Sequence, residues 1–179
     1  MQVFIAIFIA ASIAALFIIS RPKLYRVQSV LDGDTVIVKR ASRRTTIRLA
    51  SIDCPESDQE WGDIATAGLV KLIGGKRIRV EPHTWDQYGR TIATIHVLDR
   101  NKGEWVNVNR RMVMLGHAWV YRRYLDHLPQ HQINELFQLE SWARRKRVGL
   151  WRRERPLPPW VFRQRSRLAG TESLVRRIA

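Results

Sequence analysis

The clearest structural pattern in this sequence lies in residues 24–50, which read LYRVQSVLDGDTVIVKRASRRTTIRLA. Three runs within it are rich in β-branched and alternating apolar residues, at 24–30, 35–39 and 45–50. The polar turns DGD and ASRR separate these runs. Short runs of this kind between Gly, Asp and Ser residues are typical of strands joined by tight turns. The stretch therefore predicts a three-stranded β-meander.

Two further strands and three helices are expected in the rest of the chain. Residues 77–81 and 91–97 read as strands. Apolar side chains recur at helical spacing in three segments, 64–73, 105–115 and 131–147, and glycines lie beyond each of them. One helix falls between the third and fourth strands, and two follow the fifth. This order favours an α+β fold, a five-stranded Greek-key β-barrel of the OB type with three α-helices.

The N-terminal residues have a different character from the rest of the chain. Residues 2–20 read QVFIAIFIAASIAALFIIS and carry no charged side chain. An apolar segment of about 20 residues can span a bilayer as a helix. An uncleaved transmembrane anchor is the expected reading, with a cleaved secretory signal and a buried core helix as alternatives. The predicted organisation is an anchor or signal segment (1–20), a central domain (21–151) and a C-terminal tail (152–179).

The net charge indicates a polyanionic partner. Lys and Arg number 31 against 16 Asp and Glu, a formal net charge of +15 at pH 7. Binding to phosphates releases condensed counterions, so this surplus favours nucleic acid. A membrane-surface protein held by anionic lipid would explain the charge as well. The tail is rich in Arg and Pro (RRERPLPPW at 152–160), and we expect it to be extended.

Acidic and guanidinium side chains occur together in two segments. Asp34 stands at the start of the second strand, and the third strand carries Arg48 and leads to Asp53. If the strands bring them together, the two carboxylates can supply oxygen ligands to a hard cation such as Ca²⁺. Arg48 and Arg90 are the basic partners for phosphate chemistry. Each piece alone is also typical of an ordinary turn or a solvated surface, so the prediction depends on the combination.

The combination resembles staphylococcal nuclease and its bacterial relatives. The motifs that carry the resemblance are D-G-D-T-V at 32–36, R-L-x-x-I-D-C-P-E at 48–56 and D-x-Y-G-R at 86–90. Further matches are G-H-A-W-V-Y-R-R-Y at 116–124, G-L-W at 149–151 and P-P-W at 158–160. The resemblance covers about Tyr25 to Phe162 and leaves out the N-terminal segment and the end of the tail.

The resemblance implies roles for the matching residues. The Ca²⁺ ligands would be Asp34, Asp53 and the main-chain carbonyl of Cys54, where the type member has Thr. The groups that act on the scissile phosphate and the attacking water would be Arg48, Arg90 and the candidate general base Glu56. The tyrosines along the bound nucleotide would be Tyr88, Tyr121 and Tyr124.

The expected activity is that of a Ca²⁺-dependent nuclease, which hydrolyses DNA and RNA with little sequence specificity and leaves 3′-phosphates. The alternative is a membrane-tethered OB-fold module that binds single-stranded nucleic acid without cutting it. The complete set of acidic and arginine residues favours the enzyme. No protein partner is implied, and the catalytic domain is expected to be monomeric.

The expected location is a bacterial-type inner membrane, with the chain anchored by one N-terminal helix. Basic residues directly after this segment favour a cytoplasmic domain. The hazard of a nonspecific nuclease beside the chromosome favours the exported side, which we expect. Cleavage of the segment would instead give a secreted or periplasmic protein.

Overall fold

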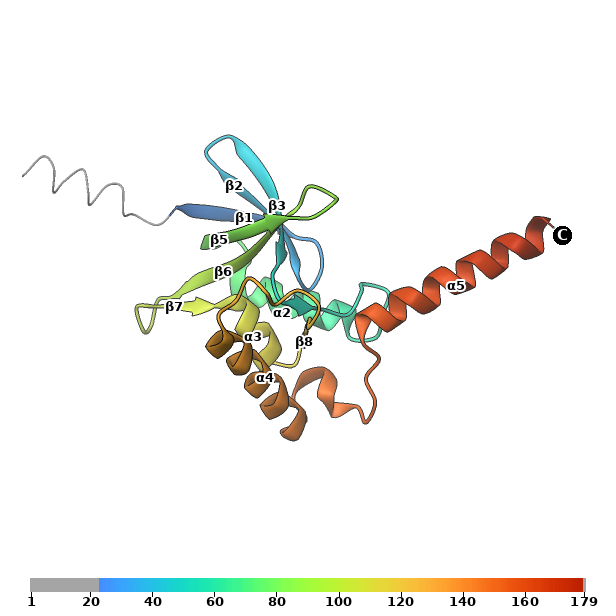
Figure 1. Ribbon diagram of the computed structural model, residues 1–179. Coiled ribbons are helices and arrows are strands. Elements are labelled where there is room, and N and C mark those ends of the chain that lie inside the picture. Colours follow the sequence, from blue (N-terminus) through green and yellow to red (C-terminus); the bar gives the residue numbers. More distant parts are fainter. Residues whose placement is uncertain (1–22, 179) are drawn as a thin grey trace, which may run out of the picture.

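The structure is a computed structural model that describes residues 23–178, with side chains up to residue 169. Figure 1 shows a small β-barrel, helices packed against one end of it, and a long C-terminal helix that leaves the body at one side. The expected anchor, residues 1–20, lies outside the described residues. In the described part of the chain, no helix has the length and apolarity that a bilayer crossing requires.

The described residues form eight strands, four α-helices and one 3₁₀ helix. In chain order they are β1 Leu24–Val30, β2 Thr35–Arg40, β3 Arg43–Leu49, β4 Ile52–Asp53, α2 Gly62–Ile73, β5 Arg77–Trp85, β6 Thr91–Asp99, β7 Glu104–Asn107, α3 Val108–Met114, β8 Trp119–Val120, α4 Gln130–Arg145, the 3₁₀ helix η1 Gly149–Arg152 and α5 Pro159–Ile178.

Five of these strands form a closed barrel. The main sheet has the order β3-β2-β1-β5-β6-β7, and a parallel pairing of β3 with β6 closes the ring. Alternate side chains along these strands point into the core, and they include the fully buried Val36, Val38, Ile47, Leu49 and Ile95. The predicted α+β fold with an OB-type barrel is thereby confirmed.

One strand is longer than predicted. We expected the fourth barrel strand to end before Pro82, but β5 continues to Trp85. The pairing of β5 with β6 shifts its register between Pro82 and Thr84. Such an irregularity accommodates a proline, because one residue there need not donate a ladder hydrogen bond.

The predicted helix over 105–115 is present but begins later than expected. Its first residues form β7 against β6, and α3 begins only at Val108. Asn107 ends the strand and caps the helix, because its side chain accepts a hydrogen bond from the N–H of Arg110 at 3.0 Å.

The prediction of an extended C-terminal tail is wrong for most of its length. Residues 153–158 lie in no helix, but η1 ends at Arg152 and the helix α5 begins at Pro159. Proline suits the first helical position, because its fixed φ is already helical and its missing N–H would have no partner there. The Arg, Gln and Leu residues that follow are good helix formers. Pro159, which we expected to lie in an extended segment, is therefore the first residue of a helix.

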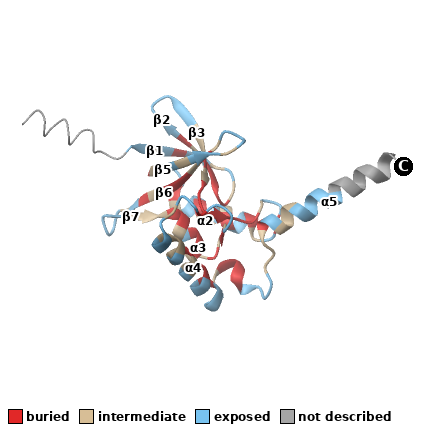
Figure 2. Ribbon diagram, viewed as in Figure 1, coloured by how far each residue is buried: buried red, intermediate tan, exposed pale blue. Residues whose placement is uncertain are grey.

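A buried asparagine ties the end of β3 to the neighbouring elements. Asn109 in α3 donates to the carbonyls of Ala50 and Ala93, at 2.9 and 3.2 Å, and accepts from the N–H of Ile95 at 3.1 Å. Figure 2 shows the buried positions concentrated where the barrel meets α2 and α3. The segment after β3, which carries the acidic motif, thus begins from a fixed point in the core.

Candidate active site

The turn between β1 and β2 holds Asp34 at the end of the barrel. The N–H of Asp34 donates to the carboxylate of Asp32 at 2.9 Å, and its carbonyl accepts from the N–H of Leu49 at 2.8 Å. The next residue, Thr35, pairs with Arg48 across β2 and β3. Local turn chemistry and strand register together therefore bring Asp34 beside Arg48.

The short pair of β4 and β8 holds Asp53 on the other side of Arg48. Asp53 lies opposite Trp119 in this pair. Ser51, just before β4, has a φ of 65°, and its hydroxyl lies 3.2 Å from Nε2 of His127. The left-handed backbone conformation of Ser51 turns the chain sharply after β3, so that Asp53 points back toward Arg48.

One guanidinium joins the two buried carboxylates. Arg48 Nη1 lies 2.5 Å from Oδ2 of Asp34, and its Nη2 lies 2.7 Å from Oδ1 of Asp53. Only 5% of Asp34 and 1% of Asp53 is exposed to solvent. At this depth the ion pairs are poorly screened, so the three groups are strongly coupled.

Burial and like charge act against ionisation of Asp34. Burial raises the pKa of Asp34 to about 7; Arg48 lowers it, and Asp32 and Asp53 raise it further. For Arg48, burial opposes the charge, but Asp34 and Asp53 outweigh it and raise the pKa of the guanidinium. A second cation near Asp34 would favour its ionised form.

Cys54 closes the site from the core side. Its N–H donates to Oδ2 of Asp34 at 2.8 Å, and its thiol is buried. Burial raises the pKa of the Cys54 thiol well above its usual range. A Cβ on Gly33 would lie 2.7 Å from the Cβ of Cys54, so the turn before Asp34 needs glycine to approach this closely.

Glu56 lies at the open edge of the same group. Its carboxylate is 36% exposed and accepts a hydrogen bond from Arg163 in α5, with Nη1 and Oε1 2.5 Å apart. Its N–H donates to the side chain of Gln59 at 3.2 Å. Asp34, Arg48, Asp53, Glu56 and Arg163 form one connected set, which we call the active-site cluster.

Arg90 and Tyr88 lie on the hairpin before β6. The side chain of Arg90 pairs with Asp86 at 2.7 Å and lies 5.6 Å from the ring centroid of Tyr88. Hydrogen bonds from Arg90 and Tyr88, opposed by burial, lower the pKa of Asp86. Residue 91 is opposite Ile47 in β3, so the backbone of Arg90 lies beside the strand that carries Arg48. The side chain of Arg90, however, is paired with Asp86 within the hairpin.

The other two predicted substrate tyrosines lie after β8. The rings of Tyr121 and Tyr124 have centroids 5.4 Å apart, and Tyr121 also packs against Trp160 at 5.9 Å. The N–H of Tyr121 donates to the carbonyl of Ser51 at 2.9 Å, which places this aromatic group next to the turn that leads to Asp53. Tyr124 is exposed and Tyr121 is half-buried, so this aromatic group offers a stacking surface for bases.

The two buried carboxylates fit a hard divalent cation. Carboxylate oxygens are the ligands that such ions prefer, with carbonyls, waters and substrate oxygens completing the shell. Among the described residues there is no group of three or more His, Cys, Asp or Glu side chains arranged to hold a metal. A cation bound by Asp34 and Asp53 would thus need main-chain, water or phosphate oxygens as well.

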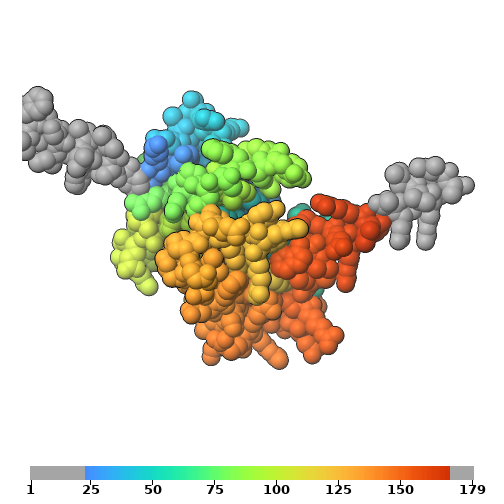
Figure 3. Space-filling view, in the orientation of Figure 1, coloured from blue at the N-terminus to red at the C-terminus, as the bar shows by residue number. Residues whose placement is uncertain are grey.

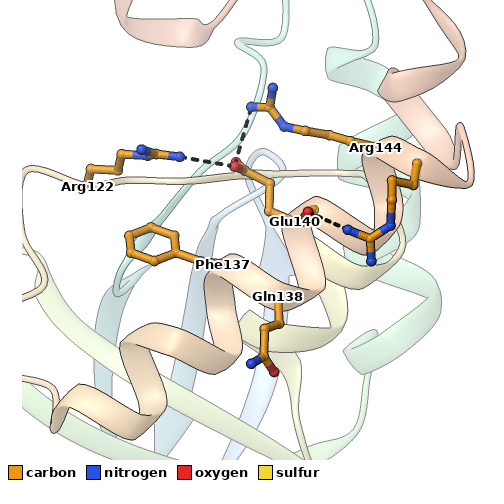
Figure 4. A pocket seen from close by; sticks show the side chains of 7 residues that line it. Arg122, Phe137, Gln138, Glu140 and Arg144 are labelled. Carbon is orange, nitrogen blue, oxygen red and sulfur yellow. Dashed lines mark hydrogen bonds and ion pairs between the residues drawn. The ribbon is translucent and has the colours of Figure 1, made fainter.

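A separate hollow of about 600 Å³ lies on α4, away from these carboxylates. Figure 4 shows Arg122 and Arg144 pointing toward Glu140, with Phe137 beneath Arg122. Their ion pairs with Glu140 are long, 3.7 and 3.4 Å. We call this the α4 hollow, and its arginines remain largely accessible to other anions.

Comparisons with known proteins identify the class of the site. The sequence model described as "Staphylococcal nuclease homologue" matches residues 46–153. The chain belongs to the staphylococcal nuclease family. The nuclease is 37% identical over 155 residues to an uncharacterized endonuclease of Escherichia coli, covering 84% of this chain and 94% of the relative.

Two more relatives extend the comparison. The nuclease is 34% identical over 143 residues to a micrococcal nuclease of Shigella flexneri, covering 78% of this chain and 80% of the relative. It is 33% identical over 167 residues to Protein ParB of Escherichia coli, covering 88% of this chain and 90% of the relative. The nuclease is accordingly a phosphodiesterase with nucleic acid as its substrate, in a family whose members generally depend on a metal ion.

The structure brings together most of the residues that the motifs predict, and adds one that they do not. Asp34, Arg48, Asp53 and Glu56 are linked within one cluster, whereas Arg90 faces Asp86. Arg163 was not predicted. The available signal was the spacing of PPW at 158–160, since a helix begun at Pro159 places residue 163 one turn later on the same face.

Proposed function

We propose that this nuclease hydrolyses DNA and RNA with little sequence specificity, depends on Ca²⁺ and leaves 3′-phosphate ends. The observation that carries the proposal is the single guanidinium of Arg48 between two buried carboxylates, with Glu56 at the open edge. A water molecule attacks phosphorus, the bond to the 5′-oxygen breaks, and the leaving oxygen takes up a proton. The products are a 3′-phosphate and a 5′-hydroxyl.

Arg48 is proposed to bind the substrate phosphate while it remains paired with Asp34 and Asp53. Its fork is held by Asp34 and Asp53 and is 15% exposed, so little reorganisation is needed when negative charge develops nearby. A guanidinium is a suitable group for this task because it stays charged when buried and presents several donors in one plane. Arg90 is proposed as the second phosphate-binding guanidinium, which requires its side chain to exchange Asp86 for substrate.

Glu56 is proposed to accept the proton of the attacking water. Its carboxylate is at the open edge of the active-site cluster, where water and a phosphodiester can both reach it. The proposed ligands of Ca²⁺ are Asp34, Asp53 and the main-chain carbonyl of Cys54. A bound divalent cation supplies Lewis-acid stabilisation of the charge that develops on the phosphate oxygens.

Base contacts are proposed to come from tyrosines rather than from hydrogen bonds that read sequence. Tyr88 is 72% exposed and Tyr124 is 62% exposed, and Tyr121 lies between Tyr124 and Trp160. Stacking on aromatic rings tolerates every base, because every base has a π-face. This is the physical reason to expect little sequence preference and activity on both DNA and RNA.

The location and the oligomeric state are part of the proposal. The uncharged residues 2–20 favour anchorage in a bacterial-type inner membrane with an exported catalytic domain, or a secreted or periplasmic protein if they are removed. The catalytic domain is proposed to act as a monomer, since all members of the active-site cluster come from one chain.

The test is cleavage of single-stranded DNA, duplex DNA and RNA by the purified full chain in detergent. The reaction is run with Ca²⁺, with excess chelator, and with Ca²⁺ restored. We expect cleavage of all three substrates, loss with chelator and recovery with Ca²⁺. Product ends are examined with a polymerase, which should extend them only after phosphatase treatment.

Two results would contradict the proposal. Tight binding of nucleic acid without cleavage in any divalent cation would indicate a binding module. Products that a polymerase extends without phosphatase treatment would show 3′-hydroxyl ends and a different direction of attack on phosphorus.

A further inference from the structure

Arg163 enters the active-site cluster from outside the part of the chain that the family comparison matches, residues 46–153. Its Nη2 lies 2.8 Å from Oδ2 of Asp53, and its Nη1 lies 3.3 Å from Oδ1 of Asp53 and 2.5 Å from Oε1 of Glu56. One planar fork therefore spans a proposed metal ligand and the proposed general base. The Arg163 side chain is 34% exposed, whereas the Arg48 side chain is 15% exposed.

The position of Arg163 is fixed by the chain that precedes it. Trp160, in the first turn of α5, packs edge-on against Trp119 with ring centroids 6.4 Å apart, and also contacts Tyr121. The carbonyl of Leu157 accepts a hydrogen bond from the side chain of Gln59 at 2.6 Å. Figure 3 shows the first turns of α5 lying against the body. The start of the helix is thus anchored on the walls of the site itself.

The loop that carries Glu56 is tied to the same C-terminal segment. Arg153 forms an ion pair with Glu60, and Gln59 contacts both the N–H of Glu56 and the carbonyl of Leu157. Gly62 permits this packing, because a Cβ there would collide with the carbonyl of Glu56. The orientation of Glu56 therefore depends on contacts with residues at the end of the matched region and just beyond it.

The contact of Arg163 with Asp53 and Glu56 orients the Glu56 carboxylate. Two carboxylates this close repel each other, and a partly exposed Glu side chain has several rotamers available to it. A guanidinium that donates to both removes the repulsion and selects one rotamer of Glu56. For Arg163 itself, burial opposes the charge, but the hydrogen bonds to Asp53 and Glu56 prevail and raise its pKa, so it remains a cation.

We propose that Arg163 is a positioning residue of this active site, which holds the Glu56 carboxylate beside Asp53 in the orientation that accepts a proton from water. The proposal rests on the nuclease function proposed above and extends it to the C-terminal segment. The first turn of α5 is then part of the catalytic unit rather than an appended basic tail.

The test compares Arg163→Ala and Arg163→Lys with the matched control Arg165→Ala in the full chain. Arg165 lies on the same helix and is exposed, so its removal costs the same charge without touching the cluster. We expect Arg163→Ala to lower kcat by about 10-fold to 100-fold, with KM for DNA changed less than about 3-fold, because misorientation acts on the chemical step. The kcat of Arg163→Lys should lie between those of the unmodified chain and Arg163→Ala, since one ammonium cannot bridge both carboxylates as the guanidinium does.

A double-mutant cycle with Glu56→Gln separates orientation from a general structural effect. If Arg163 acts through Glu56, Arg163→Ala should change kcat less than about 2-fold in the Glu56→Gln background. Thermal unfolding of all variants supplies a readout independent of catalysis, and the midpoints of Arg163→Ala and Arg165→Ala should agree within about 4 °C.

Three results would overturn the positioning role. Arg163→Ala could leave kcat unchanged, it could raise kcat as expected for a guanidinium that blocks the site, or its effect could persist undiminished in the Glu56→Gln background. Each of these leaves the nuclease itself intact. Failure of the proposed function would instead appear as absence of cleavage by the unmodified chain, so the two failures are distinguishable.

Discussion

The active-site cluster and the α4 hollow both pair arginines with glutamate or aspartate, yet they differ in geometry and burial. Arg48 is 15% exposed, and its contacts to Asp34 and Asp53 are 2.5 and 2.7 Å. Arg122 and Arg144 are 71% and 49% exposed, and their contacts to Glu140 are 3.7 and 3.4 Å. Close, desolvated pairs hold their groups in place. In the α4 hollow Glu140 is buried but its two arginines are exposed, so their long contacts are screened and the guanidinium groups are accessible to other anions.

The difference assigns separate tasks to the two regions. In the active-site cluster the arginines are held in fixed orientations that suit developing charge on one phosphate. In the α4 hollow the guanidinium groups rest on aromatic rings, with Arg144 3.9 Å from the ring centroid of Trp151 and Arg122 4.9 Å from that of Phe137. We expect these exposed arginines to attract the phosphate backbone generally, with an effect on affinity rather than on turnover.

The largest effect is expected for Arg48. Arg48→Lys should lower kcat by about 100-fold or more, because an ammonium cannot join both carboxylates and face the phosphate as a planar fork does. Steady-state kinetics on duplex DNA would measure the loss. Circular dichroism provides the folding control, since two buried carboxylates with a poorer partner also destabilise the fold. A folded variant with near-normal kcat would remove Arg48 from the mechanism.

A smaller but still large effect is expected for Arg90. Arg90→Ala should lower kcat by about 10-fold to 100-fold if its side chain leaves Asp86 to contact substrate phosphate. The conservative control is Asp86→Asn, which weakens the ion pair within the hairpin but keeps the guanidinium available. If both variants lost the same activity, the hairpin's integrity rather than the Arg90 guanidinium would be the cause.

The smallest effect is expected in the α4 hollow. Arg122→Ala should leave kcat unchanged and weaken DNA binding, with a slope of log affinity against log salt reduced by up to about 1, because Arg122 is 71% exposed and Arg144 remains to pair with the buried Glu140. Binding titrations between about 50 and about 200 mM salt would show it. An unchanged slope would mean that the backbone of the substrate does not reach α4, and that the hollow is only a solvated helix face.

The barrel could be predicted from local patterns, and the core of the active-site cluster from its match to the family's motifs. Alternation and turn residues place β2 and β3 side by side, and their register then sets Asp34 next to Arg48. The short motif from Arg48 to Glu56 keeps its acidic residues within one loop. Such relations need only neighbouring strands and a tight turn.

Other features were not predictable in this way because they depend on side-chain and strand contacts that the motifs do not show. Arg163 is 110 residues from Asp53 in sequence, and no local pattern announces that α5 begins on the wall of the site. The strand β7 was missed because residues 104–107 pair with β6 in a hairpin, and this pairing overrides their apparent helical spacing. The side chain of Arg90 likewise follows its neighbour Asp86, which the motif does not reveal.

The most direct test of the central claim is the single-turnover cleavage rate of Glu56→Gln on duplex DNA in Ca²⁺, measured beside its DNA affinity. Gln keeps the size of the side chain and a hydrogen-bond acceptor for Arg163 but cannot take up the proton of water. We predict a rate lower by about 100-fold to 10,000-fold with affinity and thermal stability preserved. A rate near that of the unmodified chain would contradict the assignment of Glu56 and, with it, the proposed mechanism.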